Sequence, residues 1–268
     1  MLASMYSGIS GMRNFQQKLD VTGNNISNVN TFGFKKGRAT FKDMVSQQIA
    51  GATAPDGGMG GSNPRQVGLG SQLASIDTVH TQGSLQNTNR ELDLGISGDG
   101  FFRVQDGDDN VFYTRAGNFY LDEDGTLVNA DGYNVLDTND EEITIDLNAQ
   151  DFSIGANGDV NITDADGNTN DNPPTISLVN FANPGGLQKE GNNLYTESVN
   201  SGDADDDNTG APGENGTGEL VAGTLEMSNV DLSEEFTEMI TAQRGFQANT
   251  RGITTADEVL QELMNLKR

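Results

Sequence analysis

The sequence predicts a mixed fold, in which long N- and C-terminal helices pair as an α-helical coiled-coil domain and the middle of the chain forms a central all-β domain. Apolar residues recur with helical spacing at both ends of the 268-residue chain. Between them, short β-type runs alternate with turn residues, and 34 glycines against 6 prolines favour tight turns. We expect an N-terminal helix at 1–30, a connector at 31–75, an all-β domain at 76–225 and a C-terminal helix at 226–268.

The N-terminal helix is predicted by apolar residues that occupy the a and d positions of a heptad pattern. These residues are Leu2, Met5, Ile9, Met12, Leu19 and Ile26. Gly8, Gly11 and Gly23 interrupt the helix, and each costs about 1 kcal/mol relative to alanine. We therefore expect this helix to be frayed on its own.

The C-terminal helix is predicted by a more regular stripe. Its members recur every seven residues and are Leu232, Met239, Phe246, Ile253 and Leu260, and the stripe is widened by Phe236, Ile240, Leu263 and Met264. Asp231 followed by Glu234 is typical of a helix N-terminus, because an Asp side chain there accepts hydrogen bonds from free backbone N–H groups. A helix from 232 to 266 would be about 50 Å long at 1.5 Å per residue.

The seven-residue period favours packing along a partner helix, and the N-terminal helix is the obvious partner. Two interpretations share that pairing. In one, the two helices form an ordinary bundle within one chain, and in the other, neighbouring subunits complete the stripes. Two helices alone bury little apolar surface, and Gly245 and Gly252 weaken the second one. We therefore favour stripes that neighbouring subunits complete.

The central all-β domain is predicted by short runs separated by glycine, asparagine and aspartate. The runs lie at 92–96, 101–104, 111–114, 119–121, 133–136, 143–145, 176–181 and 193–195, and the turn signals are Asp124-Gly125, Asp131-Gly132, Asn157-Gly158 and Asp166-Gly167. Residues 119–127 and 152–160 share one pattern of apolar and glycine positions, which predicts two similar hairpins. The Gly-rich stretches 51–64 and 201–218 are expected to be flexible.

The formal net charge of −25 is unevenly placed: residues 1–42 carry +5, residues 43–225 carry −26 and residues 226–268 carry −4. Phosphate backbones would repel such a chain, so no nucleic-acid partner is expected, and a strongly hydrated outer surface is the plain interpretation.

No window approaches the ~20 apolar residues of a membrane span, so no membrane insertion is expected. No classical signal peptide is readable at the N-terminus, so we expect a cytoplasmic chain or export without a cleaved signal.

Composition argues against catalysis. The chain has no cysteine and one histidine, His80, which we expect at an ordinary β-edge position. Two-histidine metal clusters and a cysteine nucleophile are thereby excluded. Asp164, Asp166 and Asn168 begin like a calcium-binding loop, but Thr169 stands where the sharp turn requires glycine. We expect no catalytic, cofactor-binding or metal-binding residues, and so not an enzyme.

Several segments, in order along the chain, resemble bacterial flagellar rod and hook axial proteins. They are 19–35 (LDVTGNNISNVNTFGFK), 96–104 (ISGDGFFRV), 113–119 (YTRAGNF), 193–195 (NLY), 225–232 (LEMSNVDL) and 239–247 (MITAQRGFQ). One such motif would be weak, but six in sequence are specific. The chain is identified as a member of this family, with the resemblance covering nearly its whole length.

The resemblance implies a subunit that polymerises into a hollow helical tube, with the terminal helices lining the inner tube and the β-domain forming the outer wall. The implied partners are further copies of the chain, neighbouring rod, hook-cap and hook–filament junction proteins, and the type III export apparatus, with no cofactor. The implied location is the flagellum, in the extracellular hook or the basal body. The polymerisation residues would be Leu2, Met5, Ile9, Met12, Leu19, Ile26, Leu232, Phe236, Met239, Ile240, Phe246, Ile253, Leu260 and Leu263. A helix–connector signature would comprise Asn24, Asn25, Asn28, Gly33 and Phe34, because asparagine side chains readily bond backbone groups at a helix end.

Within this family the sequence is closest to a short hook protein, which would transmit torque and pass exported subunits. Residues 87–94, 41–44 and 229–233 resemble hook sequences. The alternative is a distal-rod subunit of the basal body, since the chain has rod-like length and lacks the extra outer domain of many hook proteins. A third hypothesis, an acidic extracellular enzyme or calcium-dependent adhesin, is supported only by the acidic turns.

Overall fold

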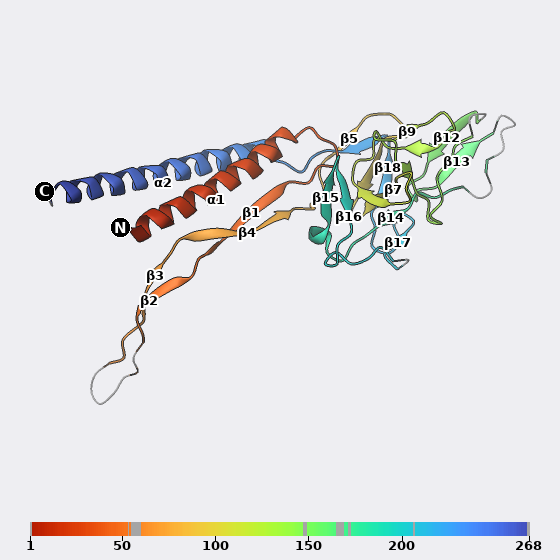
Figure 1. Cartoon of the computed structure of the whole chain (residues 1–268). Coiled ribbons are helices and arrows are strands. Elements are labelled where there is room, and N and C mark those ends of the chain that lie inside the picture. The colour runs from red at the N-terminus through yellow and green to blue at the C-terminus, as the bar shows by residue number, and fades with distance from the viewer. Residues whose placement is uncertain are drawn as a thin grey trace. The chain divides into compact units, whose positions relative to one another are not determined.

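Both terminal helices form (Figure 1), in a computed structural model that describes residues 2–52, 54, 60–146, 149–164, 169–170, 173–205 and 207–266. Helix α1 runs Leu2–Ser27 and helix α2 runs Leu232–Leu266, the span predicted from its stripe. The Asp231 carboxylate accepts a hydrogen bond from the backbone N–H of Ser233 at 2.8 Å, which confirms the predicted N-terminal cap.

The chain divides into two compact units. Unit 1 combines residues 1–27, 37–78 and 231–268, and unit 2 combines residues 28–36 and 79–230. Each unit is therefore assembled from segments far apart in the sequence, and the chain crosses between the units four times.

The predicted fold class is wrong in one respect, because unit 1 is not an α-helical coiled-coil domain. Its two helices do pack together, but strand β1 (Gly37–Asp43) pairs antiparallel with β4 (Ser71–Thr78), from Gly37↔Thr78 to Asp43↔Ser71. This pair packs along α1, where the Asn14 side chain donates a hydrogen bond to the Ser71 hydroxyl at 2.7 Å. A second pair, β2 (Ser46–Ala50) with β3 (Arg65–Gly68), continues from it. Unit 1 is thus a helix pair with a β-ribbon, and the β-rich remainder of the chain is unit 2.

The ribbon forms because one side of β4 is buried. Ser71, Leu73 and Ser75 are half-buried, while Gln72 and Ala74 between them are exposed, the two-residue period of a strand with one covered face. Most of these residues are polar, and β4 is distant in the sequence from its partner. The sequence therefore contains no local turn signal that would predict the pairing of β1 with β4.

Unit 2 is organised around a nine-stranded sheet whose central strand is β7 (Phe101–Gln105), which pairs with β8, β11 and β14. The other strands are β8 (Val111–Thr114), β9 (Tyr120–Leu121), β10 (Leu127–Val128), β11 (Asn134–Val135), β14 (Leu178–Val179), β15 (Gln188–Gly191), β16 (Leu194–Thr196) and β17 (Thr209–Gly210). Its path runs β15-β16-β8-β7-β11-β10-β9, with β14 joining β7 to β17. A short 3₁₀ helix, η1 (Pro184–Gly186), precedes β15. Six of these strands overlap predicted runs, whereas β10, β15 and β17 lie outside them. The predicted run 143–145 forms only an isolated β-bridge, from Thr144 to Thr126.

Three two-stranded pairs complete unit 2. They join β5 (Leu85–Asn87) to β19 (Thr224–Glu226), β6 (Leu94–Ser97) to β18 (Glu219–Ala222), and β12 (Asp151–Ile154) to β13 (Val160–Thr163). The first two pairs close the unit, because they bring its early strands against its last ones.

The two predicted similar hairpins are confirmed. Leu121 pairs with Leu127 across the β9–β10 turn, and Ile154 pairs with Val160 across the β12–β13 turn. Gly125 and Gly158 occupy the same place in the two turns, with φ of 81° and 82°, a left-handed conformation that glycine adopts at little cost. The predicted Asp166-Gly167 turn lies outside the described residues.

Two apolar clusters form the core of unit 2, and β7 separates them. Phe102 and Val104 lie in the larger cluster, with Leu94, Phe119 and Leu178 among its buried members. Phe101 points to the opposite side, into a cluster formed with Tyr113, Val179, Phe181, Leu187 and Tyr195. Successive side chains of a strand face opposite sides, so this one strand anchors both clusters.

Candidate functional site

The first part of the candidate site is the antiparallel pair of α1 and α2 in unit 1. The Lys18 ammonium lies 3.3 Å from the Glu238 carboxylate, and nearer the start of α1 the Thr250 hydroxyl lies 3.2 Å from the Met12 sulfur. Contacts therefore run from the N-terminal half of α2 beside the end of α1 to its C-terminal half beside the start of α1. We call the contact line between these helices the seam.

Glycines allow the two helices to approach closely along the seam. A Cβ atom built on Gly8 would lie 3.1 Å from the Ile253 side chain, and one built on Gly11 would lie 3.0 Å from the Asn249 side chain. On α2, a Cβ on Gly245 would lie 2.5 Å from the Phe15 ring. The sequence indicated only the cost of these glycines to helix stability, whereas the structure shows that three of them occupy the contact line.

The structure separates the predicted polymerisation residues into two groups. Met5, Ile9, Met12, Leu19, Ile26, Met239, Phe246, Ile253 and Leu260 are half-buried, whereas Leu232, Phe236, Ile240 and Leu263 are exposed. The side chain of Leu2 lies outside the described residues. Helix pairing within one chain therefore covers part of the predicted stripe and leaves the rest open to solvent.

A second heptad row, which the sequence analysis missed, supplies the more deeply buried positions of α2. Glu235 and Ala242 are buried, and Asn249 and Ala256 are half-buried. These residues are small or polar, so an apolar pattern could not find them. The glycines of α1 could have indicated this row. A glycine on one helix leaves space in which a polar or larger side chain of the facing helix can pack.

Asn25 of the predicted signature links three elements of unit 1. Its side-chain amide donates to the Gly37 carbonyl at 2.9 Å and to the Glu235 carboxylate at 3.2 Å, and its Oδ1 accepts from the Gly37 N–H at 2.9 Å. Asn25 is buried, so these bonds satisfy polar groups that would otherwise be costly to remove from water. Asn24, one residue earlier, is exposed.

The second part of the candidate site lies in unit 2, in the segment that follows α1. The Asn28 Oδ1 accepts a hydrogen bond from the Thr31 hydroxyl at 3.1 Å. Gly33 has a φ of 69°, and a Cβ there would lie 2.6 Å from the backbone nitrogen of Ala116, so the position requires glycine on both counts. Phe34 is buried, with the Lys189 ammonium 5.3 Å from its ring centroid. The structure thus explains Gly33 and Phe34 as residues that fix this segment against the β-rich unit.

A buried cluster of three charges, which the sequence analysis also missed, holds the same segment. The Glu226 carboxylate lies 2.6 Å from the Lys35 ammonium and 3.2 Å from the Arg115 guanidinium, and all three side chains are at most 2% exposed. The same carboxylate accepts the Gly83 N–H at 2.8 Å, and the Glu226 carbonyl accepts the Gly33 N–H at 2.8 Å. Glu226 therefore binds three separate stretches of unit 2, at residues 33–35, at Gly83 and at Arg115.

Burial perturbs the titration of the groups near this cluster. Loss of water around each group lowers the pKa of Lys35 and of Arg115, and the Glu226 charge opposes that effect. Burial, together with the positive charges of Lys35, Lys189 and Arg115, lowers the pKa of His80 to about 4. The imidazole is therefore neutral near pH 7, in an environment of aromatic rings, with centroids 5.6 Å from those of Phe101 and Tyr195. Instead of the expected β-edge position, His80 packs against the smaller apolar cluster.

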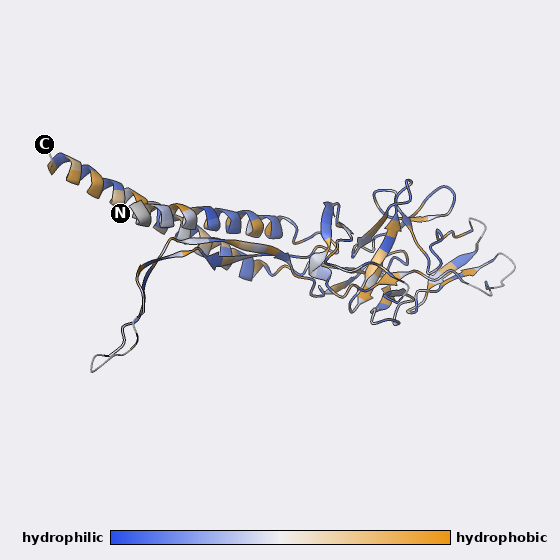
Figure 2. Ribbon diagram, turned by 60° about the horizontal axis from the view of Figure 1, so that its bottom comes forward, coloured by the Kyte–Doolittle hydropathy of each residue, from blue (hydrophilic) through white to orange (hydrophobic). Residues whose placement is uncertain are grey.

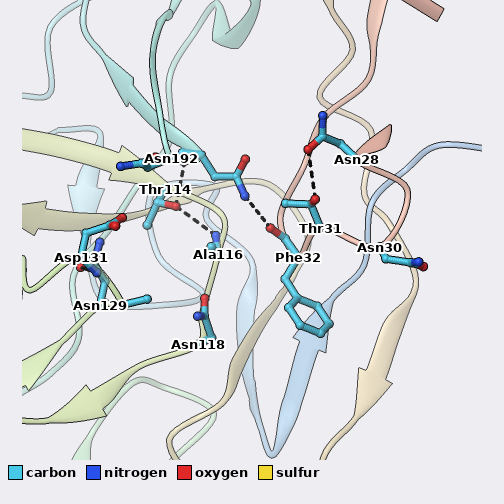
Figure 3. Close-up of a pocket in the computed structure, with 12 residues that line it drawn as sticks. Asn28, Asn30, Thr31, Phe32, Thr114, Ala116, Asn118, Asn129, Asp131 and Asn192 are labelled. Atoms are coloured by element: carbon cyan, nitrogen blue, oxygen red, sulfur yellow. Dashed lines mark hydrogen bonds between the residues drawn. The ribbon is translucent and has the colours of Figure 1, made fainter. Parts of the chain in front are cut away.

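A polar cavity of about 500 Å³ lies beside the segment after α1 (Figure 3). Asparagine, threonine and backbone groups line it, and the Asn193 amide crosses to donate to the Phe32 carbonyl at 3.0 Å. The Thr114 hydroxyl donates to the Asn193 carbonyl at 3.0 Å and accepts the Ala116 N–H at 3.1 Å. The lining is suited to hydrogen bonding, and its bonds tie the signature segment to β8 and to the turn before β16.

Within the described part of the chain, no three His, Asp or Glu residues gather closely enough to hold a metal ion. Asp166 and Asn168 of the calcium-like sequence lie outside that part. None of the helices described is both long and apolar enough to span a membrane.

Three protein-family models match successive parts of the chain. The model described as "Flagella basal body rod protein" matches residues 5–35, "Flagellar hook protein FlgE/F/G D1 domain" matches residues 95–162, and "Flagellar basal body rod FlgEFG protein C-terminal" matches residues 221–266. The first and third include most of α1 and α2, and the second includes β7 and the two similar hairpins.

Curated relatives match over full length. The flagellar basal-body rod protein FlgG of Bacillus subtilis (strain 168) is 61% identical over 268 residues, which is 100% of both chains. Two relatives come from Borreliella burgdorferi: its FlgG is 37% identical over 273 residues, and its flagellar hook protein FlgE is 32% identical over an alignment of 445 residues. Both alignments cover 100% of this chain and of the relative.

Substituting Gly245 with alanine should weaken the helix pair, and the same substitution at Gly252 provides a matched control. A Cβ at Gly245 meets the Phe15 ring, whereas one at Gly252 meets nothing within 4 Å. Gly252→Ala should stabilise α2 by up to about 1 kcal/mol through helix propensity. Gly245→Ala should be less stable than Gly252→Ala by about 1–3 kcal/mol, the usual cost of overpacking. Thermal unfolding followed by circular dichroism at 222 nm measures both, and equal stabilisation by the two substitutions would contradict a close seam.

Replacing Glu226 with glutamine should destabilise unit 2 by about 3–5 kcal/mol, because it leaves two buried cations without their counter-charge. The control is Asp140→Asn, which removes the exposed partner of Arg103 and should cost at most about 1 kcal/mol. Urea unfolding at pH 7 measures both free energies. If Glu226→Gln costs no more than Asp140→Asn, the buried cluster does not hold the unit together.

Proposed function

The chain belongs to the family of bacterial flagellar rod and hook axial proteins, and from this membership we propose that it is the distal-rod subunit of the flagellar basal body. The single observation that carries the proposal is the 61% identity to a rod protein over the whole of both chains. The hook relative from Borreliella burgdorferi needs an alignment of 445 residues to cover the 268 of this chain, so that hook protein contains much sequence without a counterpart here.

The comparisons favour the rod alternative over the hook subunit that the sequence first suggested. In Borreliella burgdorferi, the rod protein is both more similar to this chain and nearly equal to it in aligned length. Two segments that suggested a hook protein are 87–94 and 229–233. The first directly precedes one family model that rod and hook proteins share, and the second lies inside another. Local likeness there does not distinguish the two, whereas aligned length and identity over the full chain support the rod assignment.

As a flagellar axial protein, the chain is a structural subunit at the flagellum that polymerises with neighbouring axial proteins. We propose that the exposed residues of the predicted stripe, Leu232, Phe236, Ile240 and Leu263, lie in contacts between subunits. Burying such side chains on assembly would contribute about 25 cal/mol for each Å² of apolar surface removed from water. Export through the type III apparatus, passage of later subunits through the tube and transmission of torque belong to the same proposal.

The location of the chain in isolated basal bodies tests the rod assignment. Antibodies against the chain should label the rod, and a strain that lacks the gene should lose the distal rod together with the hook outside it. Labelling of the hook instead, with an intact rod in the deletion strain, would contradict the proposal. Restoring the gene to the deletion strain is the control.

A further inference from the structure

Helix α2 extends beyond its partner. Gly245 lies against Phe15 and Ile253 lies against Gly8, so the antiparallel register is fixed near the start of α1. At 1.5 Å per residue in both helices, α1 reaches only about six residues past this last contact. The final turns of α2, residues 259–266, therefore extend past the N-terminal end of α1 (Figure 1). We call these residues the overhang.

The overhang carries an exposed apolar stripe. Val259, Leu263 and Leu266 are 45%, 52% and 82% exposed and lie at positions i, i+4 and i+7, so they share one helix face. Met264, at 73% exposure, lies about 100° further round the helix from Leu263 and is not part of this face. Hydrophobic residues mark these turns in Figure 2. This is the pattern of anchors with which an amphipathic helix enters an apolar groove.

A groove of about 700 Å³ lies elsewhere in unit 1, on the side of α1 that faces the β-ribbon. Most of its lining surface is apolar and comes from Tyr6, Ile9, Met44, Leu69 and Leu73. Polar residues of α1 and β4 also line it, among them Arg13 and Gln17. Its volume lies within the ~300–1,000 Å³ typical of pockets that hold small ligands, so it has room for several side chains.

The overhang cannot enter the groove of its own chain. The groove occupies the α1 residues 6–17, which lie alongside the paired part of α2, on a different side of α1 from the seam. The overhang continues α2 as a helix and leads away from the part of α1 that lines the groove. A rigid helix does not turn back on itself, so only another molecule could fill the groove with such a stripe.

The charges of the two surfaces are complementary. Glu262 lies three residues from Val259 and four from Leu266, beside the stripe, and Arg13 lines the groove. Neither side chain forms an ion pair within the described residues. When the overhang enters the groove, the Glu262 carboxylate would therefore meet the unpaired Arg13 guanidinium. This pairing favours the overhang as the occupant over a helix that brings a positive charge to Arg13.

We infer that the overhang of α2 docks in the groove between α1 and β4 of a second copy of this chain. The contact joins two different surfaces, so each copy offers a groove to one neighbour and an overhang to another. Such head-to-tail contacts do not close on a pair, and they generate rings or open helical polymers. The inference deepens the proposed assembly function and rests on it.

The absence of cysteine from the chain allows a clean test by disulfide cross-linking. Cells would co-express two variants, Gln17→Cys in the groove and Leu266→Cys at the end of the stripe, and their basal bodies would be isolated and oxidised. The expected result is a cross-linked dimer that contains one copy of each variant. The control pairs Gln17→Cys with Gln247→Cys, an exposed position on the paired part of α2, and should yield several-fold less dimer.

Basal bodies that assemble without the 17–266 cross-link would overturn the inference, and so would dimers linked through residue 266 in both copies. Since assembly and location are read on the same preparation, such a failure would leave the proposed function standing. If a cysteine variant does not assemble, exchanging the charges of Arg13 and Glu262 tests the docking contact instead. Arg13→Glu or Glu262→Arg alone should reduce polymerised protein several-fold, and the double variant should restore it. Failure of the double variant to restore polymer would also overturn the inference.

Discussion

The close approach of α1 and α2 is the constraint on which the rest of unit 1 depends. Gly8, Gly11 and Gly245 remove the side chains that would hold the helices apart, at a cost in helix propensity that only packing can offset. Because the seam is narrow and partly polar, it covers one side of each helix. Apolar residues such as Phe236 and Ile240 remain on the surface. A helix pair built in this way is suited to a subunit whose remaining apolar faces are covered by other copies.

Unit 2 depends on a different interaction, the buried charges around Glu226. Glu226 lies shortly before α2, and its carboxylate and backbone bind Gly33 and Lys35 after α1, Gly83 after β4, and Arg115 after β8. Removing three charges from water is costly unless each is paired and hydrogen-bonded, and here Lys35 also donates to the Thr81 carbonyl at 2.9 Å. A cluster of this kind fixes one arrangement of these segments of unit 2.

Much of the fold could be predicted from the sequence, and the parts that could not share a physical cause. Helix α2, its cap and the two hairpins at Gly125 and Gly158 follow from local patterns. The β1–β4 ribbon, the seam glycines and the Lys35–Glu226 pair depend on residues far apart in the chain, and no local pattern encodes such contacts. Rod and hook proteins share the local motifs, so local sequence does not distinguish between them. The assignment of the exposed stripe to subunit contacts stays a prediction.

The central claim is that this chain is an axial subunit whose terminal helices are completed by neighbouring copies. Amide hydrogen exchange, measured residue by residue along α2 in the purified monomer and in isolated basal bodies, tests it most directly. The account predicts rapid exchange of the overhang and of the first turns of α2 in the monomer, and strong protection of both after assembly. Equal protection in the two states would show that neighbouring subunits do not complete the helices.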